Sequence, residues 1–231
     1  LTVLVARADI ITWDGSGGNS WNLGDNWDLG TVPGPADEAR FTDTGITAGQ
    51  SIILAASQTI NRLNITATKN FTIGDPADVS STNTLTLCDV YHQNADSNSI
   101  VINVILASNS LWTVDGSGIL HVKGDVNGDT NSLTKNGTGE MRMTCNSIGY
   151  TGVTTVLEGT INWPSGNGVL KAGLVVGSVT GTTANYITPW GGSGMPSGKS
   201  VTVYTNSYFV QGDYPGIGTL RITGGEANNS W

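Results

Sequence analysis

Apolar and polar residues alternate with a period of two along much of the chain. The alternation is clearest in residues 132–163, where it defines three short segments at 140–144, 153–157 and 160–163. A period of two places successive side chains on opposite faces of a strand, so each segment predicts a half-buried β-strand. No segment is long enough for a helix, and the apolar residues do not follow helical spacing. The pattern predicts an all-β fold built from short strands.

Glycine-rich turns separate these segments, because glycine adopts positive φ angles without a steric penalty. The same alternation predicts further strands at residues 51–54, 58–65, 70–74, 85–90, 100–106, 111–114, 119–122, 174–179, 200–205, 208–211 and 219–223. Comparable strand starts fall at residues 133, 154, 174, 201 and 219. Spacings of roughly 20 residues are typical of solenoids, in which each coil stacks on the one before.

Residues 132–163 resemble the autotransporter-associated β-strand repeat, also called the passenger-associated transport repeat. The matching positions are Leu133, Thr134, Lys135, Gly137, Gly139, Met141, Met143, Tyr150, Gly152, Thr154, Val156, Gly159 and Ile161. Cys145 and the connection 146–149 are less typical of the repeat. The resemblance implies a right-handed parallel β-helix on a secreted or surface-exposed bacterial protein. It implies a scaffold without catalytic residues.

Residues 13–41 resemble the opening module that precedes such repeats, with the pattern W-x-G…W…N-W…P…D-x-A-x-F. The matching positions are Trp13, Trp21, Asn26, Trp27, Pro33, Asp37, Ala39 and Phe41. We therefore expect a Trp-rich N-terminal cap over residues 13–50 and β-helix repeats over 51–231. A cap would cover the open end of the stack, where strand edges and apolar surface are otherwise exposed. The other interpretation of three closely spaced tryptophans is a sugar-stacking platform.

Residues 1–12 allow two interpretations. One is the remnant of a signal peptide, with Ala6-Arg7-Ala8 as a cleavage site. The other is a β-strand that either completes its own domain or is donated to the next copy of the chain. Residues 219–231 show no recognisable cap, so we expect this last coil to offer a second surface for contacts between copies. A head-to-tail contact of that kind builds filaments, because it does not close into a ring.

The charge of the chain excludes two classes of partner. It has 10 Lys and Arg against 18 Asp and Glu, giving a formal net charge of −8 at pH 7. Nucleic acids and anionic membranes need clustered cations, so neither is expected as a partner. No apolar run approaches the roughly 18 residues of a membrane-spanning helix. The few lysines and the acidic, polar composition favour an extracellular location.

The residues that could bind a metal or catalyse a reaction are better interpreted as turn residues than as parts of a site. Residues 125–129 read D-V-N-G-D, like the start of a calcium loop, but the sixth and twelfth positions of an EF-hand are filled by Thr130 and Asn136. Asp75, Asp78, Asp89 and Asp96 are interpreted as turn residues, and His92 and His121 lack neighbours at metal-ligand spacing. No metal site, cofactor or catalytic residue is predicted.

The two cysteines, Cys88 and Cys145, lie more than two coils apart at about 20 residues per coil. Disulfide bonds do not span that separation, so we expect free, buried thiols. Glycosylation sequons occur at Asn64, Asn70, Asn136 and Asn228, and the sequence leaves their use open.

These patterns together predict a non-catalytic extracellular structural protein of a cell surface or fibre, which associates with identical copies. The second interpretation is an adhesin-type module that binds carbohydrate or a cell surface. The third is a polysaccharide-degrading β-helix enzyme, for which a groove with two carboxylates and a Lys or Arg would be the mark.

Overall fold

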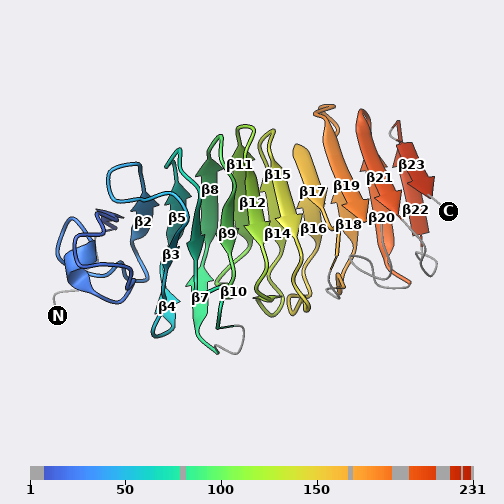
Figure 1. The fold of residues 1–231 in the computed structure, drawn as a ribbon. Coiled ribbons are helices and arrows are strands. Elements are labelled where there is room, and N and C mark those ends of the chain that lie inside the picture. The colour runs from blue at the N-terminus through green and yellow to red at the C-terminus, as the bar shows by residue number, and fades with distance from the viewer. Residues whose placement is uncertain are drawn as a thin grey trace, which may run out of the picture.

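A computed structural model describes residues 8–78, 82–165, 169–188, 198–211, 219–224 and 226–229. Its strands wind into an elongated parallel β-solenoid, with β2 near one end of the long axis and β22 near the other (Figure 1). Every pairing between named strands is parallel, and three sheets run along the axis. The predicted all-β parallel β-helix is confirmed.

The largest sheet has ten strands. In spatial order they are β1 (Ile10–Thr12), β2 (Glu38–Phe41), β5 (Arg62–Ile65), β8 (Asp89–Gln93), β11 (Ser110–Asp115), β14 (Leu133–Asn136), β16 (Thr154–Val156), β18 (Leu174–Val176), β20 (Ser200–Tyr204) and β22 (Thr219–Thr223). Consecutive neighbours are one coil apart in sequence, so the sheet grows by one strand per coil.

A second sheet has nine strands. In spatial order they are β3 (Gln50–Ile52), β6 (Phe71–Ile73), β9 (Asn98–Ile100), β12 (Ile119–Val122), β15 (Glu140–Met143), β17 (Gly159–Asn162), β19 (Ala184–Thr188), β21 (Ser207–Gln211) and β23 (Glu226–Asn229).

The third sheet is shorter and has four strands. They are β4 (Gln58–Thr59), β7 (Thr84–Leu87), β10 (Asn103–Leu106) and β13 (Val126–Asn127). A single 3-10 turn at Gly24–Asn26 is the helical element of the described residues.

The coil register agrees with the sequence spacing. Leu133 pairs with Thr154, and Thr154 pairs with Leu174, in adjacent strands of the ten-stranded sheet. β18, β20 and β22 continue the series, so the strand starts predicted at 133, 154, 174, 201 and 219 all belong to this one sheet. The longer third step leaves the stacking of the sheet unchanged, because β18 still pairs with β20.

The core lies along the axis, between the sheets. Five residues expected to point into it, Leu133, Met141, Met143, Val156 and Ile161, are fully buried at 0% exposure. Their strands alternate buried and partly exposed positions, as a half-buried strand requires. The predicted core is confirmed at these positions.

Three predicted strands are divided by sharp corners in the structure. The segments 58–65, 85–90 and 100–106 each contribute one strand to the four-stranded sheet and another to a larger sheet. At the second corner only Cys88 separates β7 from β8. The alternation shifts by one residue at this corner, because two partly exposed residues, Cys88 and Asp89, lie between buried Leu87 and buried Val90. A single continuous strand would not show that shift. The prediction of continuous strands was wrong at these corners.

Two other segments differ from their predictions. Residues 126–127, interpreted as part of a turn, form β13, and Ala184–Thr188 forms β19, which the sequence did not predict. β1 and β2 lie within the ranges assigned to the N-terminal strand and the cap, yet both belong to the ten-stranded sheet. Residues 1–7 of the proposed N-terminal strand lie outside the described residues.

Candidate functional site

The tryptophans of the N-terminal region form a closed aromatic cluster. Trp13, Trp21 and Trp27 are at most 1% exposed, and all three contact Phe41 at ring-centroid distances of 5.6–6.0 Å. Trp27 packs edge-on against both other tryptophans, at 5.2 and 5.0 Å. Phe41 in turn contacts Phe71 of the next coil at 5.2 Å. The cluster therefore caps the core as predicted, and buried rings exclude the sugar-stacking interpretation.

Aspartate side chains bond the backbone of the following coil. The Asp89 carboxylate accepts a hydrogen bond from the Leu111 backbone N–H at 2.9 Å, and Asp115 accepts one from Thr138 at 3.2 Å. Asp89 lies in β8, so its interpretation as a turn residue was wrong. We call these contacts inter-coil aspartate bonds. They satisfy an N–H group in the turn between β14 and β15 and one near the start of β11, before its pairing with β8 begins.

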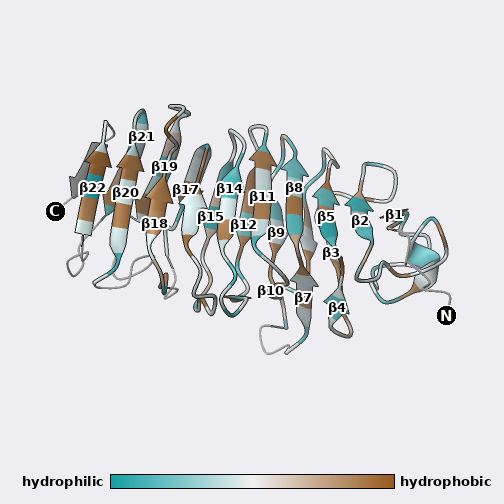
Figure 2. Ribbon diagram, turned by 180° about the vertical axis from the view of Figure 1, so that it is seen from behind, coloured by the Kyte–Doolittle hydropathy of each residue, from teal (hydrophilic) through white to brown (hydrophobic). Residues whose placement is uncertain are grey.

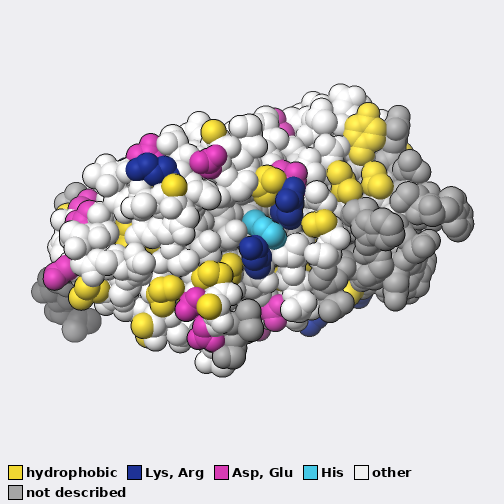
Figure 3. Space-filling view, viewed as in Figure 1, with side chains coloured by type: hydrophobic (Ala, Val, Ile, Leu, Met, Phe, Trp, Pro, Cys, Tyr) yellow, Lys and Arg dark blue, Asp and Glu magenta, His cyan; other side chains and the backbone are white. Residues whose placement is uncertain are grey.

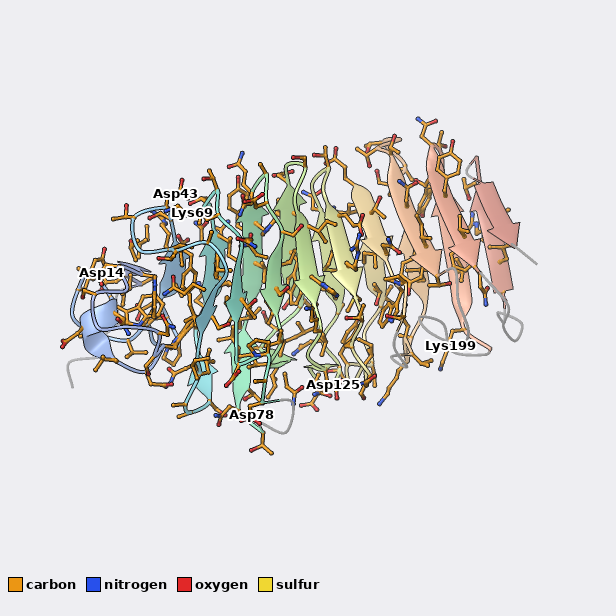
Figure 4. All side chains as sticks on the ribbon, viewed as in Figure 1. Asp14, Asp43, Lys69, Asp78, Asp125 and Lys199 are labelled. Atoms are coloured by element: carbon orange, nitrogen blue, oxygen red, sulfur yellow. The ribbon has the colours of Figure 1, made fainter. Side chains whose placement is uncertain are left out.

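Asp43 gives a further bond of this kind near the capped end. It accepts hydrogen bonds from the backbone N–H of Thr68 at 2.6 Å and from the Thr68 hydroxyl at 2.9 Å, which lower the pKa of the Asp43 carboxyl. The neighbouring Lys69 ammonium donates to the carbonyl oxygens of Asp43 and Ile46 (Figure 4). Carboxylate and ammonium therefore both hold backbone groups of this turn.

The segment that resembles a calcium loop also joins two coils. One oxygen of Asp125 accepts hydrogen bonds from the backbone N–H groups of Asn146 and Ser147, at 3.1 and 2.8 Å. Asp129 adopts a positive φ of 49°, which is typical of a tight turn. Within the described ranges, no three His, Cys, Asp or Glu side chains lie close enough together to hold a metal ion.

One of the two histidines is fully buried and the other is only partly buried. His92 is fully buried, and its Nε2 lies 3.0 Å from Oδ1 of Asn98, which also accepts a hydrogen bond from Asn94. We therefore assign the proton to Nε2, which leaves Nδ1 without a partner. Burial lowers the pKa of His92, so the neutral ring is favoured.

His121 points outward from β12 and lies 2.9 Å from the Thr144 hydroxyl. Partial burial, followed by the charges of Lys123 and Arg142, lowers the pKa of His121 to about 4. Figure 3 shows a histidine between two basic side chains on this face of the molecule. Arg142 also forms a 2.9 Å ion pair with Glu140, so part of its charge is neutralised.

Lys135 is the buried charge that the sequence did not identify as unusual. Its side chain is 0% exposed, and Nζ donates to the carbonyl oxygens of Gly137 and Glu158, the second at 2.9 Å. Burial lowers the pKa of Lys135 to about 8, against the opposing influence of Asp115 and Glu158. The sequence did hold a signal for this role: Lys135 precedes Gly137 and Gly139 in the repeat-like motif. In the structure its ammonium binds the Gly137 carbonyl of that turn.

The thiols are unpaired, as expected. Cys145 is buried in the core, and burial raises its pKa to about 12, so the thiol is inert at neutral pH. Cys88 is free but only partly buried, which corrects the expectation of full burial. Of the sequon asparagines, Asn64 is nearly buried and donates to Glu38 at 2.7 Å, whereas Asn70 is exposed.

One surface pocket combines carboxylates with a lysine. It has a volume of about 330 Å³ and lies where the nine-stranded and four-stranded sheets meet. Asp75, Lys123, Asp125 and Asn146 line it: Asp75 follows β6, Lys123 and Asp125 follow β12, and Asn146 follows β15. Figure 4 places Asp125 and the nearby Asp78 along the lower edge of the solenoid, away from the aromatic cap.

No family model matches the chain, and neither a curated protein nor a solved structure shows significant similarity to it. The resemblance to the autotransporter-associated repeat therefore stays a prediction. No helix in the described part of the chain is long and apolar enough to cross a membrane.

Proposed function

We propose that this chain is a non-catalytic structural protein of a cell surface or an extracellular fibre. The supporting observation is that four of its aspartate side chains bond the backbone of a neighbouring coil. Asp43, Asp89, Asp115 and Asp125 each accept backbone N–H groups of the following coil. A catalytic carboxylate pair needs open oxygens at a fixed separation around a substrate. Asp75 and Asp125 line a pocket together with Lys123, so a polysaccharide-cleavage assay tests them directly. Carboxylates that join coils instead make a stiff rod.

An extracellular location is supported by composition. The net charge of −8 and the ten basic residues in 231 suit a solvated outer surface and disfavour polyanionic partners inside a cell. The free thiol of Cys145 does not contradict this location, because it is buried and protected from oxidants, whereas Cys88 is only partly buried.

Identical copies are the partners we propose. β1 and β22 end the ten-stranded sheet, and within the described residues no further strand pairs with β22. At the other end, Asp28 bonds the backbone N–H and C=O of Thr12, so only the part of β1 before Thr12 offers an open edge. Free edges of a sheet bind additional strands through main-chain hydrogen bonds. Leu220 and Ile222 of β22 are 43% and 48% exposed, and Ile10 of β1 is 50% exposed, so both edges also carry apolar side chains. Head-to-tail stacking would join these edges into a filament.

Two deletions separate the roles of the N-terminal segment. Removing residues 1–7 leaves β1 paired with β2, whereas removing residues 1–12 deletes β1 itself. If the segment is donated to the next copy, both deletions abolish filaments in electron micrographs while the circular dichroism of the subunit is preserved. Long filaments from both deleted proteins would contradict donation by this segment. Filaments lost only with residues 1–12 would assign the contact to β1.

The proposed function is tested by location and by turnover. Immunogold labelling of intact cells of the source should place the chain on the outer surface or on a fibre. The purified chain should release no reducing ends or unsaturated sugars from a panel of polysaccharides. Labelling confined to the cell interior would contradict the structural proposal, and so would sustained polysaccharide cleavage.

A further inference from the structure

The surface pocket presents several polar groups that the fold leaves unused. Asp75 uses Oδ1 to accept the backbone N–H of Ala77, and Asp125 uses Oδ1 for the backbone of the next coil. Asn103 uses its Oδ1 to accept the Asp125 backbone N–H at 3.0 Å. Each side chain is thereby held in place by one atom. Oδ2 of each aspartate and Nδ2 of Asn103 take no hydrogen bond within the described residues.

Lys123 completes this set of free groups. It is exposed, lines the pocket, and forms no ion pair or hydrogen bond with the described residues, unlike Arg142 on the next strand. Asn146 is likewise exposed, and its carboxamide is free. The pocket therefore combines two acceptor oxygens with ammonium and amide donors. Val101 and the ring of Pro76 supply apolar surface beside them.

We propose that this pocket binds a neutral saccharide ring. A hydroxyl group both donates and accepts hydrogen bonds, so a ring with adjacent hydroxyls satisfies carboxylates and an ammonium together. Val101 and Pro76 would contact the C–H groups of the ring. The volume of about 330 Å³ is at the lower end of the range for small-molecule sites, which suits a ligand of about one sugar ring.

Charge distinguishes a neutral sugar from other polar ligands. Two carboxylates face one ammonium in the pocket, so a phosphate or a uronic acid would meet net repulsion. Calcium prefers six to eight oxygen ligands, but the ammonium of Lys123 lines the same pocket as the two carboxylates and would repel a cation. The fixed aspartate oxygens favour hydroxyl donors, because a neutral ligand has no charge of its own to desolvate on binding.

This site is independent of the structural role proposed above, because a rod carries a surface site without using it for assembly. The pocket lies between the nine-stranded and four-stranded sheets, whereas the proposed contacts between copies are at the ends of the ten-stranded sheet. The corner is rigid: a side chain at Gly124 would collide with the backbone carbonyl of Ile102, so the two coils approach closely there. A rigid corner holds Asn103, Lys123 and Asp125 in fixed relative positions.

The test is a titration of the ¹⁵N-labelled whole chain followed by amide chemical shifts. The neutral probes are the methyl glycosides of glucose, galactose and mannose, and N-acetylglucosamine. Sodium glucuronate and calcium chloride are the charged comparators. At least one neutral probe should shift the amides of Gly124, Asp125 and Asn146 in a saturable way. Lys123→Met should weaken that binding about tenfold, because one charge-assisted hydrogen bond is lost.

Lys171→Met is the matched control, because Lys171 is an exposed lysine that does not line the pocket. It should bind the neutral probe as the unaltered chain does. Lys123 makes no contact that folding requires, so both variants should retain the amide spectrum of the folded protein. Three results would overturn the proposal: no shift with any neutral probe, equal binding by Lys123→Met, or saturation by calcium or glucuronate alone. None of them bears on the surface location or the filaments.

Discussion

The two halves of the solenoid differ in their third face. Between residues 58 and 127 each coil contributes a strand to the four-stranded sheet, and beyond β13 that sheet ends. A single parallel bridge, from Val126 to Ile148, carries the pairing one coil further. Yet the buried apolar column continues: Leu85 and Val104 are fully buried, and Ile148 and Leu170 are 1% exposed. Burial of one side chain per coil, more than strand pairing, defines this face.

The halves also differ in the polarity of their strands. Figure 2 shows β2, β5 and β8 with long hydrophilic stretches, β18 as hydrophobic, and β20 and β22 with hydrophobic bands between hydrophilic or intermediate ones. Ion pairs between alternate residues of one strand do not distinguish the halves, because Arg40 pairs with Glu38 in β2 at 2.7 Å and Arg142 pairs with Glu140 in β15 at 2.9 Å. We call residues 58–127 the three-sheet half and the coils beyond β13 the two-sheet half. Because its third face is also joined by strand pairing, we infer that the three-sheet half is the more rigid.

The largest expected effect is a difference between two core truncations. Leu85→Ala removes a side chain flanked by paired strands on both sides, so the cavity cannot collapse and the free energy of unfolding should fall by about 4–5 kcal/mol. Leu170→Ala lies beyond the four-stranded sheet and should cost about 2–3 kcal/mol. Denaturant unfolding of both variants measures the difference. Equal costs would mean that strand pairing on the third face adds no rigidity.

The next effect is a pH dependence specific to the two-sheet half. The pKa of Lys135 is about 8 in the folded chain and about 10.5 when exposed, so between these values the unfolded state binds more protons. The free energy of unfolding should therefore rise with pH above about 8, by roughly 1–3 kcal/mol.

Lys135→Met should lose that rise, which denaturant unfolding at pH 7.5 and 9.5 measures. Burial raises the pKa values of Cys145 and Tyr150, so the thiol opposes part of the rise from about pH 9 and the tyrosine at higher pH, equally in both proteins. A variant that keeps the full rise would show that the Lys135 ammonium is solvated in the folded state.

A smaller effect is expected from a single inter-coil aspartate bond in the three-sheet half. Asp89→Ala leaves the Leu111 N–H without its partner and should cost about 1 kcal/mol. Asp89→Asn keeps an acceptor oxygen and should cost less than half of that. Thermal unfolding of both variants checks the prediction. If asparagine costs as much as alanine, the charge of Asp89 matters and the hydrogen bond does not.

No effect is expected from removing calcium. Oδ1 of Asp125 is already occupied by two backbone N–H groups, so residues 125–129 need no ion to hold their turn. The melting temperature should be the same in EDTA and in calcium chloride. A drop of several degrees on chelation, reversed by calcium, would contradict this interpretation of the segment.

The sequence predicts the coils better than their corners. A period of two reports which face of a strand is buried, and Met141, Met143 and Ile161 follow it without exception. The corner at Cys88 leaves only a one-residue shift in that pattern, between buried Leu87 and buried Val90, and so small a shift is missed when the segment is treated as one strand. The pocket was likewise not predictable, since Asp75 and Asp125 come from different coils and meet only through the stacking register.

The central claim is that this solenoid is a structural element that works in contact with copies of itself. Electron microscopy of the native surface material or fibre tests it most directly. The account predicts rods placed end to end, with their axes in line and a spacing along the axis of about 4.8 Å from stacked strands. Native material in which the chain occurs only as separate, dispersed particles would contradict it.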